Sequence, residues 1–201
     1  MARWFALARM RSARYLFSAA VLPGGQVIVA GGCNPSLQCK PLSSAEIFDM
    51  DAGPGGGIWS PLPDMQTGRE GSACCCTPTG RSGGPGRMGG QFVVLGGRTG
   101  SDRRPDSVGR SVPKYLDTVE VFDLHSRSWT DGPVMPAGGR FGAAACCLGG
   151  QVIVLGGANG LGPTNSVEAW DTLAAVPRWL PLPEMLSSRC MAGAGVLVRT
   201  K

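Results

Sequence analysis

The sequence is short of the residues on which many catalytic sites depend. Its 201 residues include one histidine, His125, and two tyrosines, Tyr15 and Tyr115. A Ser-His-Asp arrangement would have to use His125, which stands in the polar segment 124–127, where a tight turn is predicted. Histidine-based catalysis is therefore not expected.

Long hydrophobic runs and charge blocks of one sign are missing as well. No apolar run approaches the roughly 18 residues that a transmembrane helix needs. The net charge of +5 is a mild bias, and no aromatic residues are interleaved with the basic ones. We therefore expect neither nucleic acid nor a membrane as a partner.

The eight cysteines lack the C-x2-C pairs that are typical of structural zinc sites. Residues 74–76 and residues 146–147 are runs of adjacent cysteines, and neighbours on a strand point to opposite faces, so a disulfide framework is not predicted. Reduced, buried thiols indicate a reducing compartment, and we predict a cytoplasmic location. Cys33 and Cys39 share one loop, which leaves a metal or redox pair as an alternative.

Glycine, at 32 residues, is abundant, while 43% of the chain is hydrophobic. The glycines fall between and at the ends of valine-rich runs, where turns need positive φ. Composition therefore predicts a folded, turn-rich and mostly β chain of one domain.

Five markers recur in one order along the chain. A valine strand ends in a double glycine three times, at 26–32, 91–97 and 151–157. A strand containing glutamate follows each, at 45–49, 119–123 and 167–171. A tryptophan then stands six residues ahead of a methionine, as in Trp59–Met65, Trp129–Met135 and Trp179–Met185, with a further copy at Trp4–Met10. After each methionine come an arginine and a run of small residues, the arginines being Arg14, Arg69, Arg140 and Arg189.

These markers resemble the kelch repeat over essentially the whole chain. The family pattern has a double glycine ending the second strand, an aromatic in the third and a spaced tryptophan in the fourth. The usual third-strand tyrosine is replaced here by Phe48, Phe122 and Trp170. The resemblance implies an all-β propeller of four-stranded blades around a central channel. Stacking of blades also explains how each sheet buries two apolar faces.

The repeat predicts three complete four-stranded blades and two part-blades within residues 1–201. The complete blades are expected at 11–65, 66–135 and 136–185. Residues 1–10 are predicted to be the outer strand of a preceding blade, and 186–201 the inner strand of a following one.

The two part-blades affect how the ends of the chain are interpreted. The start of the chain is rich in arginine and free of acidic residues, which would also fit an organelle transit peptide, but Trp4 and Met10 favour an outer strand. Kelch propellers resemble closed rings with more blades than these 201 residues supply. The blades at the two ends of the array are therefore expected to leave apolar faces uncovered. We therefore expect other propeller blades as partners, either from a longer chain, which we favour, or from a second copy.

Alternating strand directions place the loops after the double glycines and the links between blades on one face. Ligand-binding residues are predicted on that face: Arg14, Arg69, Arg140, Arg189, Arg98, Arg103, Arg104, Asn34 and Asn159. The arginine fork suits carboxylates and phosphates. The predicted ligand is therefore an acidic or phosphorylated peptide segment of a protein, and the resemblance to kelch ubiquitin-ligase adaptors implies the same.

The repeated arginines have an alternative interpretation. They could pair with the repeated Glu46, Glu120 and Glu168, or bond backbone carbonyls between blades. Arginines in the irregular 98–117 loop are then the better candidates, because long loops are often functional.

An enzymatic role is the alternative to binding. Copper-radical oxidases resembling galactose oxidase need two tyrosines and two histidines, which this chain does not supply. Kelch-type sugar epimerases and hydrolases rely on arginine and acidic residues, so a fragment of such an enzyme stays the alternative. We predict a non-enzymatic scaffold or substrate-recognition propeller, with no catalytic residues, cofactor or metal.

Overall fold

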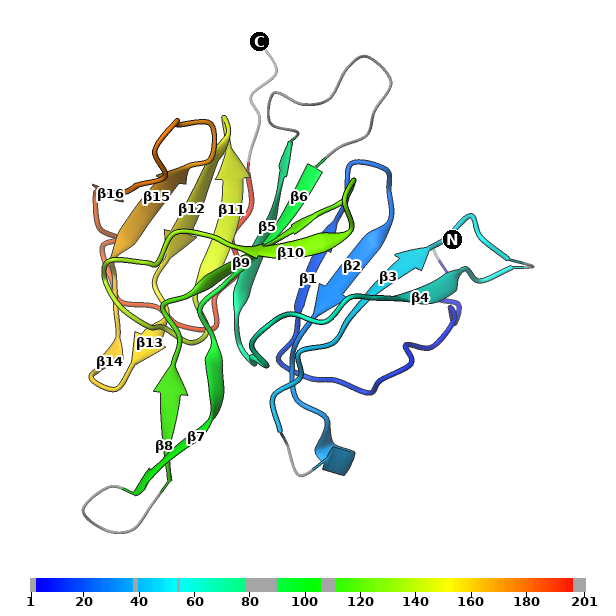
Figure 1. Cartoon of the computed structure of the whole chain (residues 1–201), viewed down its shortest axis with the longest axis horizontal. Helices are drawn as coiled ribbons and strands as arrows, with labels where there is room; N and C mark the ends of the chain where they lie inside the picture. The colour runs from blue at the N-terminus through cyan, green and yellow to red at the C-terminus, as the bar shows by residue number, and fades with distance from the viewer. Residues whose placement is uncertain (1–2, 38–39, 54, 79–89, 106–110, 197–201) are drawn as a thin grey trace.

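Three antiparallel sheets of four strands make up the protein (Figure 1). The computed structural model describes residues 3–37, 40–53, 55–78, 90–105 and 111–196. The first sheet, blade 1, contains β1 (Ser18–Val21), β2 (Val27–Ala30), β3 (Ala45–Asp49) and β4 (Ile58–Leu62). The second, blade 2, contains β5 (Ala73–Pro78), β6 (Gly90–Leu95), β9 (Val119–Asp123) and β10 (Ser128–Asp131). The third, blade 3, contains β11 (Ala144–Leu148), β12 (Gln151–Leu155), β15 (Val167–Asp171) and β16 (Trp179–Leu182).

Smaller elements connect the second and third strands of each blade. They are the helical turn η1 (Pro35–Leu37) in blade 1, the hairpin β7 (Arg98–Pro105) with β8 (Ser111–Tyr115) in blade 2, and the hairpin β13 (Ala158–Asn159) with β14 (Gly162–Pro163) in blade 3. All three lie on the same side of the molecule, at the bottom of Figure 1. No helix in the described part of the chain is long and apolar enough to cross a membrane.

The register of strands is the same in every blade. The buried valine of the second strand stands opposite the glutamate of the third in Val29↔Glu46, Val94↔Glu120 and Val154↔Glu168. Since strand side chains alternate between faces, one fixed register puts the repeated glutamate at the same place in each blade. The predicted all-β fold and its four-stranded blades are confirmed.

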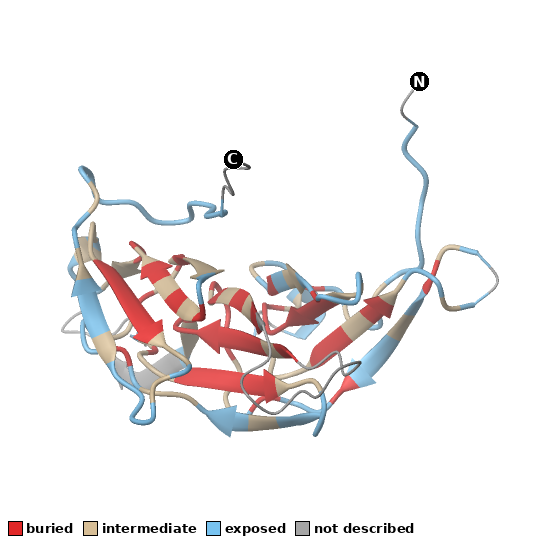
Figure 2. Ribbon diagram, turned by 90° about the horizontal axis from the view of Figure 1, so that it is seen from above, coloured by how far each residue is buried: buried red, intermediate tan, exposed pale blue. Residues whose placement is uncertain are grey.

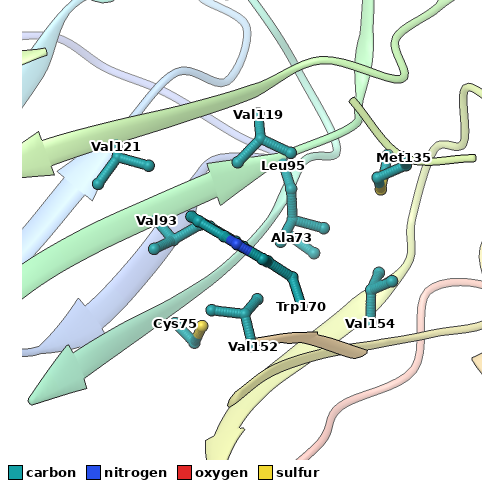
Figure 3. Close-up of a cluster of buried hydrophobic side chains, with 10 residues drawn as sticks. All are labelled: Ala73, Cys75, Val93, Leu95, Val119, Val121, Met135, Val152, Val154 and Trp170. Atoms are coloured by element: carbon teal, nitrogen blue, oxygen red, sulfur yellow. The ribbon is translucent and has the colours of Figure 1, made fainter. Parts of the chain in front are cut away.

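The core lies between the blades. Trp170 of blade 3 packs among Val93 and Leu95 of blade 2 and Val152 of its own blade (Figure 3). A second cluster joins Leu62 and the rest of blade 1 to Phe92, Val94 and Phe122 of blade 2. A single four-stranded sheet cannot bury both of its apolar faces by itself. The burial of apolar side chains between neighbouring blades therefore stabilises the array.

The blades form a curved array with the buried strands inside it (Figure 2). The fourth strands are largely exposed: β4, for example, buries only Leu62, and β16 buries no residue fully. The second and third strands of each blade are more buried than the first and fourth, because they have a strand on both sides.

Within the described parts of the two predicted part-blades, residues 3–10 and 186–196, no strand is formed, although Ala8 N donates a backbone hydrogen bond of 3.0 Å to Gly56 O. Residues 1–2 and 197–201 of these predicted strands lie outside the described part of the structure. A strand needs a ladder of partners, and neither segment lies beside a sheet of its own blade. The 98–117 loop, expected to be irregular, is instead the β7–β8 hairpin, with register shifts after Thr99 and Asp102.

Candidate functional site

The repeated arginine of blade 2 lies in a buried site between strands. Arg69 is 0% exposed, and its Nη2 lies 2.7 Å from Glu120 Oε1. Its Nη1 donates to Gly96 O at 2.9 Å and to Thr118 O at 3.1 Å. Burial lowers the pKa of Arg69, and the opposite charge of Glu120 counteracts part of that shift.

The same arrangement recurs in the neighbouring blades. Arg14 pairs with Glu46 at 2.6 Å, and Arg140 pairs with Glu168 at 2.7 Å. Both arginines also donate to the carbonyl of the first glycine of the pair, Gly31 or Gly156. We call these three pairs, Arg14–Glu46, Arg69–Glu120 and Arg140–Glu168, the Arg–Glu layer.

Each glutamate of the Arg–Glu layer also binds the chain that enters its blade. Glu120 accepts hydrogen bonds from the backbone N–H groups of Gln66, at 2.7 Å, and Thr67, at 3.2 Å. Glu46 binds Arg11 N and Ser12 N in the same way, and Glu168 binds Ala137 N. The carboxylates therefore fix the links between blades.

This geometry changes the interpretation of the repeated arginines. Arg14, Arg69 and Arg140 are at most 8% exposed and have their guanidinium groups bonded inside the blades. They therefore offer no surface to a ligand, as the alternative interpretation of the sequence anticipated. Arg189 is exposed, and the structure brings its backbone, rather than its side chain, into contact with blade 3, through Thr164 O and Gly157 N.

Backbone hydrogen bonds link successive blades near the axis of the array. Gly71 N donates to Leu16 O, Gly142 N to Gly71 O and Met191 N to Gly142 O, at 2.8, 2.8 and 2.6 Å. Each of these residues lies two positions after a repeated arginine and has φ between 54° and 63°. One hydrogen bond of this series joins each pair of neighbouring segments. In each of them the N–H of the later segment donates to the carbonyl of the earlier one.

The repeated tryptophans form a second set of links, at the outer rim. Trp129 Nε1 donates to Pro63 O at 2.8 Å. Trp59 and Trp179 donate likewise to Ala8 O and Pro133 O, each at 2.9 Å. The acceptor always lies two residues before the methionine of the preceding segment. Tryptophan recurs because it fills space with its ring and holds the blades together with its N–H.

We call the surface formed by residues 33–37, 40–44, 96–105, 111–118 and 158–166 the hairpin face; it carries several basic residues that do not recur. Lys40 and Lys114 are exposed, and Arg98 is half-buried. Arg103 and Arg104 lie in β7, and their side chains fall outside the described part of the structure. Asn34 and Asn159 act in local turns, since their side-chain oxygens accept from Ser36 N at 2.9 Å and Leu161 N at 2.8 Å.

Arg98 joins two blades on the hairpin face. Its Nε donates to Glu70 Oε1 at 2.5 Å, and its guanidinium lies 4.6 Å from the centre of the Phe141 ring. Glu70 is 6% exposed, so Arg98 neutralises a buried carboxylate while keeping part of its own surface accessible. No sequence pattern pointed to Glu70 or Phe141, because the position after each repeated arginine varies from Tyr15 to Glu70 to Phe141.

A groove of about 340 Å³ lies beside Lys40 on the hairpin face, between blades 1 and 2. We call it the hairpin groove; it is lined by Lys40, Pro41, Ser43, Gln66, Gly68, Thr99 and Gly100. Its lining offers an ammonium group, two hydroxyls and an amide, and contains no carboxylate. Two carboxylates bind lining residues from outside it: Asp64 accepts from Ser43 Oγ at 3.1 Å, and Glu120 accepts from Gln66 N at 2.7 Å. Such a lining suits an anionic group.

Most of the thiols lie on the inner strands. Cys74, Cys75 and Cys76 are in β5, Cys146 and Cys147 are in β11, and all five are free. Burial raises the pKa of Cys74 to about 12 and that of Cys76 to about 11. Cys33 is buried and Cys39 lies outside the described residues, so the proposed pair of these two stays untested. Within the described chain, no group of three ligands is placed to hold a metal ion.

Comparisons with known proteins agree with this geometry. The Kelch motif family model matches residues 14–66, 82–136 and 139–186. Kelch domain-containing protein 8B of Homo sapiens is 29% identical over 153 residues, which are 75% of this chain and 38% of that protein. An F-box/kelch-repeat protein of Arabidopsis thaliana is 30% identical over 92 residues, 46% of this chain and 24% of that protein.

A solved structure is similar as well. The structure of YjhT matches with a TM-score of 0.69 over 94% of this chain and 57% of that one, at 17% identity, which shows a likeness of fold. The chain spans less than half the length of the curated relatives described above. Because the Kelch motif is matched three times over more than half of its residues, the chain belongs to the kelch-repeat family.

Proposed function

We propose that this chain is a protein-binding scaffold or substrate-recognition propeller whose hairpin face takes an acidic or phosphorylated peptide segment. The hairpin groove carries the proposal, because Lys40 stands at a concave, carboxylate-free site between two blades. Lys114 and the accessible part of Arg98 add positive charge to the same face. These charges would attract an acidic segment before it reaches the groove.

The kelch relatives support a protein partner. One of them is an F-box/kelch-repeat protein, and an F-box is a recruiting module of ubiquitin-ligase adaptors. We therefore propose a substrate-recognition role within such an adaptor, with recruitment supplied by another segment or subunit. The free thiols fit a reducing compartment, and we place the chain in the cytoplasm.

Peptide binding tests this proposal. We would measure fluorescence anisotropy with three labelled peptides of one sequence, carrying serine, glutamate or phosphoserine at two positions. The acidic and phosphorylated peptides should bind and the serine peptide should not. Lys40→Glu should weaken binding about fivefold to tenfold, the effect of reversing one exposed charge.

Arg178→Glu is the matched control, because Arg178 is exposed and lies outside the hairpin face. It changes net charge by the same amount as Lys40→Glu. Equal losses in both variants would mean that overall charge, rather than the groove, attracts the peptide. Retention of full affinity by Lys40→Glu would contradict the proposed site.

A further inference from the structure

A second groove lies at the opposite end of the junction between blades 1 and 2. Its volume is about 350 Å³, within the range of sites that hold a small ligand or a side chain. It opens on the turn face, which we define by the strand-connecting turns at 22–26, 50–53, 55–57, 124–127, 149–150 and 172–178. We call it the turn groove; it is lined by Leu22, Pro23, Gly24, Gln26, Ile47, Asp49, Asp51, Leu62, Gly90, Phe122, Leu124 and Arg127.

The floor of the turn groove is apolar and continuous with the core between blades 1 and 2. Leu62 and Phe122 are 6% and 1% exposed and belong to the cluster that joins the two blades. Ile47 and Leu124 pack partly buried against the same cluster and present apolar surface toward the groove. A bulky apolar side chain entering the groove would therefore exchange water for fixed apolar walls.

The two walls of the turn groove carry opposite charges. Blade 1 contributes Asp49 and Asp51, and blade 2 contributes Arg127. Asp49 is held in place, since its Oδ2 accepts from Gln26 Nε2 at 2.8 Å and its Oδ1 from Asp51 N at 3.0 Å. Arg127 is fixed at its backbone, which has φ of 53° and donates to Asp123 O at 2.9 Å.

The side chains that carry these charges are accessible. Asp51 and Arg127 are exposed, and neither forms an ion pair with another residue of the described chain. Their charges are therefore available to a ligand on either side of the apolar floor. Carboxylates on one wall also disfavour a polyanion such as nucleic acid.

We propose that the turn groove binds a peptide segment of a partner protein in which a bulky apolar side chain stands between a basic and an acidic residue. The apolar side chain occupies the floor over Ile47 and Leu124. The basic residue lies against Asp49 and Asp51, and the acidic residue lies against Arg127. The site differs in chemistry from the hairpin groove and does not depend on the function proposed for it.

Defined peptides test this inference. Capped Gly-Arg-Leu-Glu-Gly and Gly-Glu-Leu-Arg-Gly would be titrated into the full chain, with Gly-Gly-Leu-Gly-Gly and free leucine as comparators. Methyl NMR signals of Ile47 and Leu124 would report binding in the groove. At least one of the two charged peptides should shift them saturably, with at least tenfold higher affinity than either comparator.

Variants separate the walls from the floor. Asp51→Lys and Arg127→Glu should each weaken the charged peptide about fivefold, and Leu124→Gln should weaken it while both charges remain. Arg178→Glu, on the same face and outside the groove, should have no effect.

Three results would overturn the inference. The first is equal binding of the charged and uncharged peptides, which would remove the charged walls from recognition. The second is equal binding of free leucine, which would make this a small-molecule site. The third is saturable binding without shifts at Ile47 and Leu124, which would place the peptide elsewhere.

Discussion

Arg69 and Arg98 both belong to blade 2, yet the molecule uses them differently. Arg69 recurs in every blade, is 0% exposed and forms its ion pair inside the sheet. Arg98 has no counterpart in the other blades and pairs with Glu70 at a half-exposed position of the hairpin face. Recurrence at this position therefore marks a residue that builds the scaffold, whereas Arg98, which does not recur, keeps part of its surface accessible to solvent.

The residue that follows each repeated arginine differs from blade to blade. Tyr15, Glu70 and Phe141 differ in sequence but occupy equivalent places, bridged to Cys33, Arg98 and Ala158 after the double glycines. The backbone there repeats while the side chain does not. Each blade can thus present a different group near the axis without altering how it is built.

The largest effect should come from breaking the Arg–Glu layer. Arg69→Ala leaves Glu120 buried without its charged partner and should lower the free energy of unfolding by about 3–5 kcal/mol. Urea denaturation would measure the loss. Arg98→Ala is the matched change at an arginine whose side chain is 36% exposed, and it should lower the free energy of unfolding less, by about 1–2 kcal/mol, because Glu70 is buried but water can reach the place that Arg98 vacates. Similar losses in both variants would erase the distinction between recurring and non-recurring arginines.

The double glycine should give the next largest effect. A Cβ on Gly96 would lie 2.6 Å from Arg140 O, and φ there is +66°. Gly138 has a similar φ of +84° with nothing within 4 Å of a Cβ. Gly138→Ala should therefore cost about 1–2 kcal/mol from the backbone alone, and Gly96→Ala a further 1–3 kcal/mol or so from overpacking.

Thermal unfolding of both glycine variants would measure this difference. An equal loss of stability would show that the recurring glycine is needed for its backbone conformation and not for the close approach of the next blade.

Removing one tryptophan hydrogen bond should have a smaller effect. Trp129→Phe keeps a ring against Phe92 and Phe122 but deletes the bond from Nε1 to Pro63 O. We expect a loss of about 1 kcal/mol in the free energy of unfolding. Trp4→Phe, at a fully exposed residue, should leave stability unchanged and serves as the control.

The smallest perturbation is thiol labelling, which leaves the fold intact. In a Cys39→Ser background, Ellman's reagent at pH 8 should modify Cys190 first, because Cys190 is exposed. Cys74 and Cys76 should react slowly, since burial raises their pKa to about 12 and about 11 and little thiolate forms at that pH. Their rates should rise with pH as the thiolate fraction grows.

A Cys190→Ser variant should remove the fast phase of labelling. Fast labelling that persists in this variant would mean that the recurring inner strands open readily to solvent.

The repeat was sufficient to predict the blades from the sequence. Double glycines, glutamate strands and tryptophan–methionine pairs fixed the order of strands, because each marker has one position in a blade. The same reasoning could not decide the role of Arg69. Charged side chains are usually exposed, and the partner Glu120 lies far away in the chain, so only the folded register shows that the two meet inside the sheet.

Features that occur once were the hardest to predict. The β7–β8 hairpin stands where an irregular loop was expected, since its pairing includes register shifts that no simple alternation predicts. Asn34 and Asn159 were predicted to bind a ligand but accept hydrogen bonds from their own turns. The Glu70–Arg98–Phe141 contact depends on three segments that only the fold brings together.

The backbone bonds that join Leu16, Gly71, Gly142 and Met191 give the array a direction. In this series every N–H donates toward the earlier blade, whereas Gly32 N and Gly97 N donate toward Arg69 O and Arg140 O of the following one. The two sides of a blade therefore offer different groups to their neighbours and are not interchangeable. Units joined in this head-to-tail manner close into a ring when the rotation between them divides a full turn, and otherwise continue as a helix. The angle between successive blades, rather than any single residue, therefore determines how many blades such a propeller can hold.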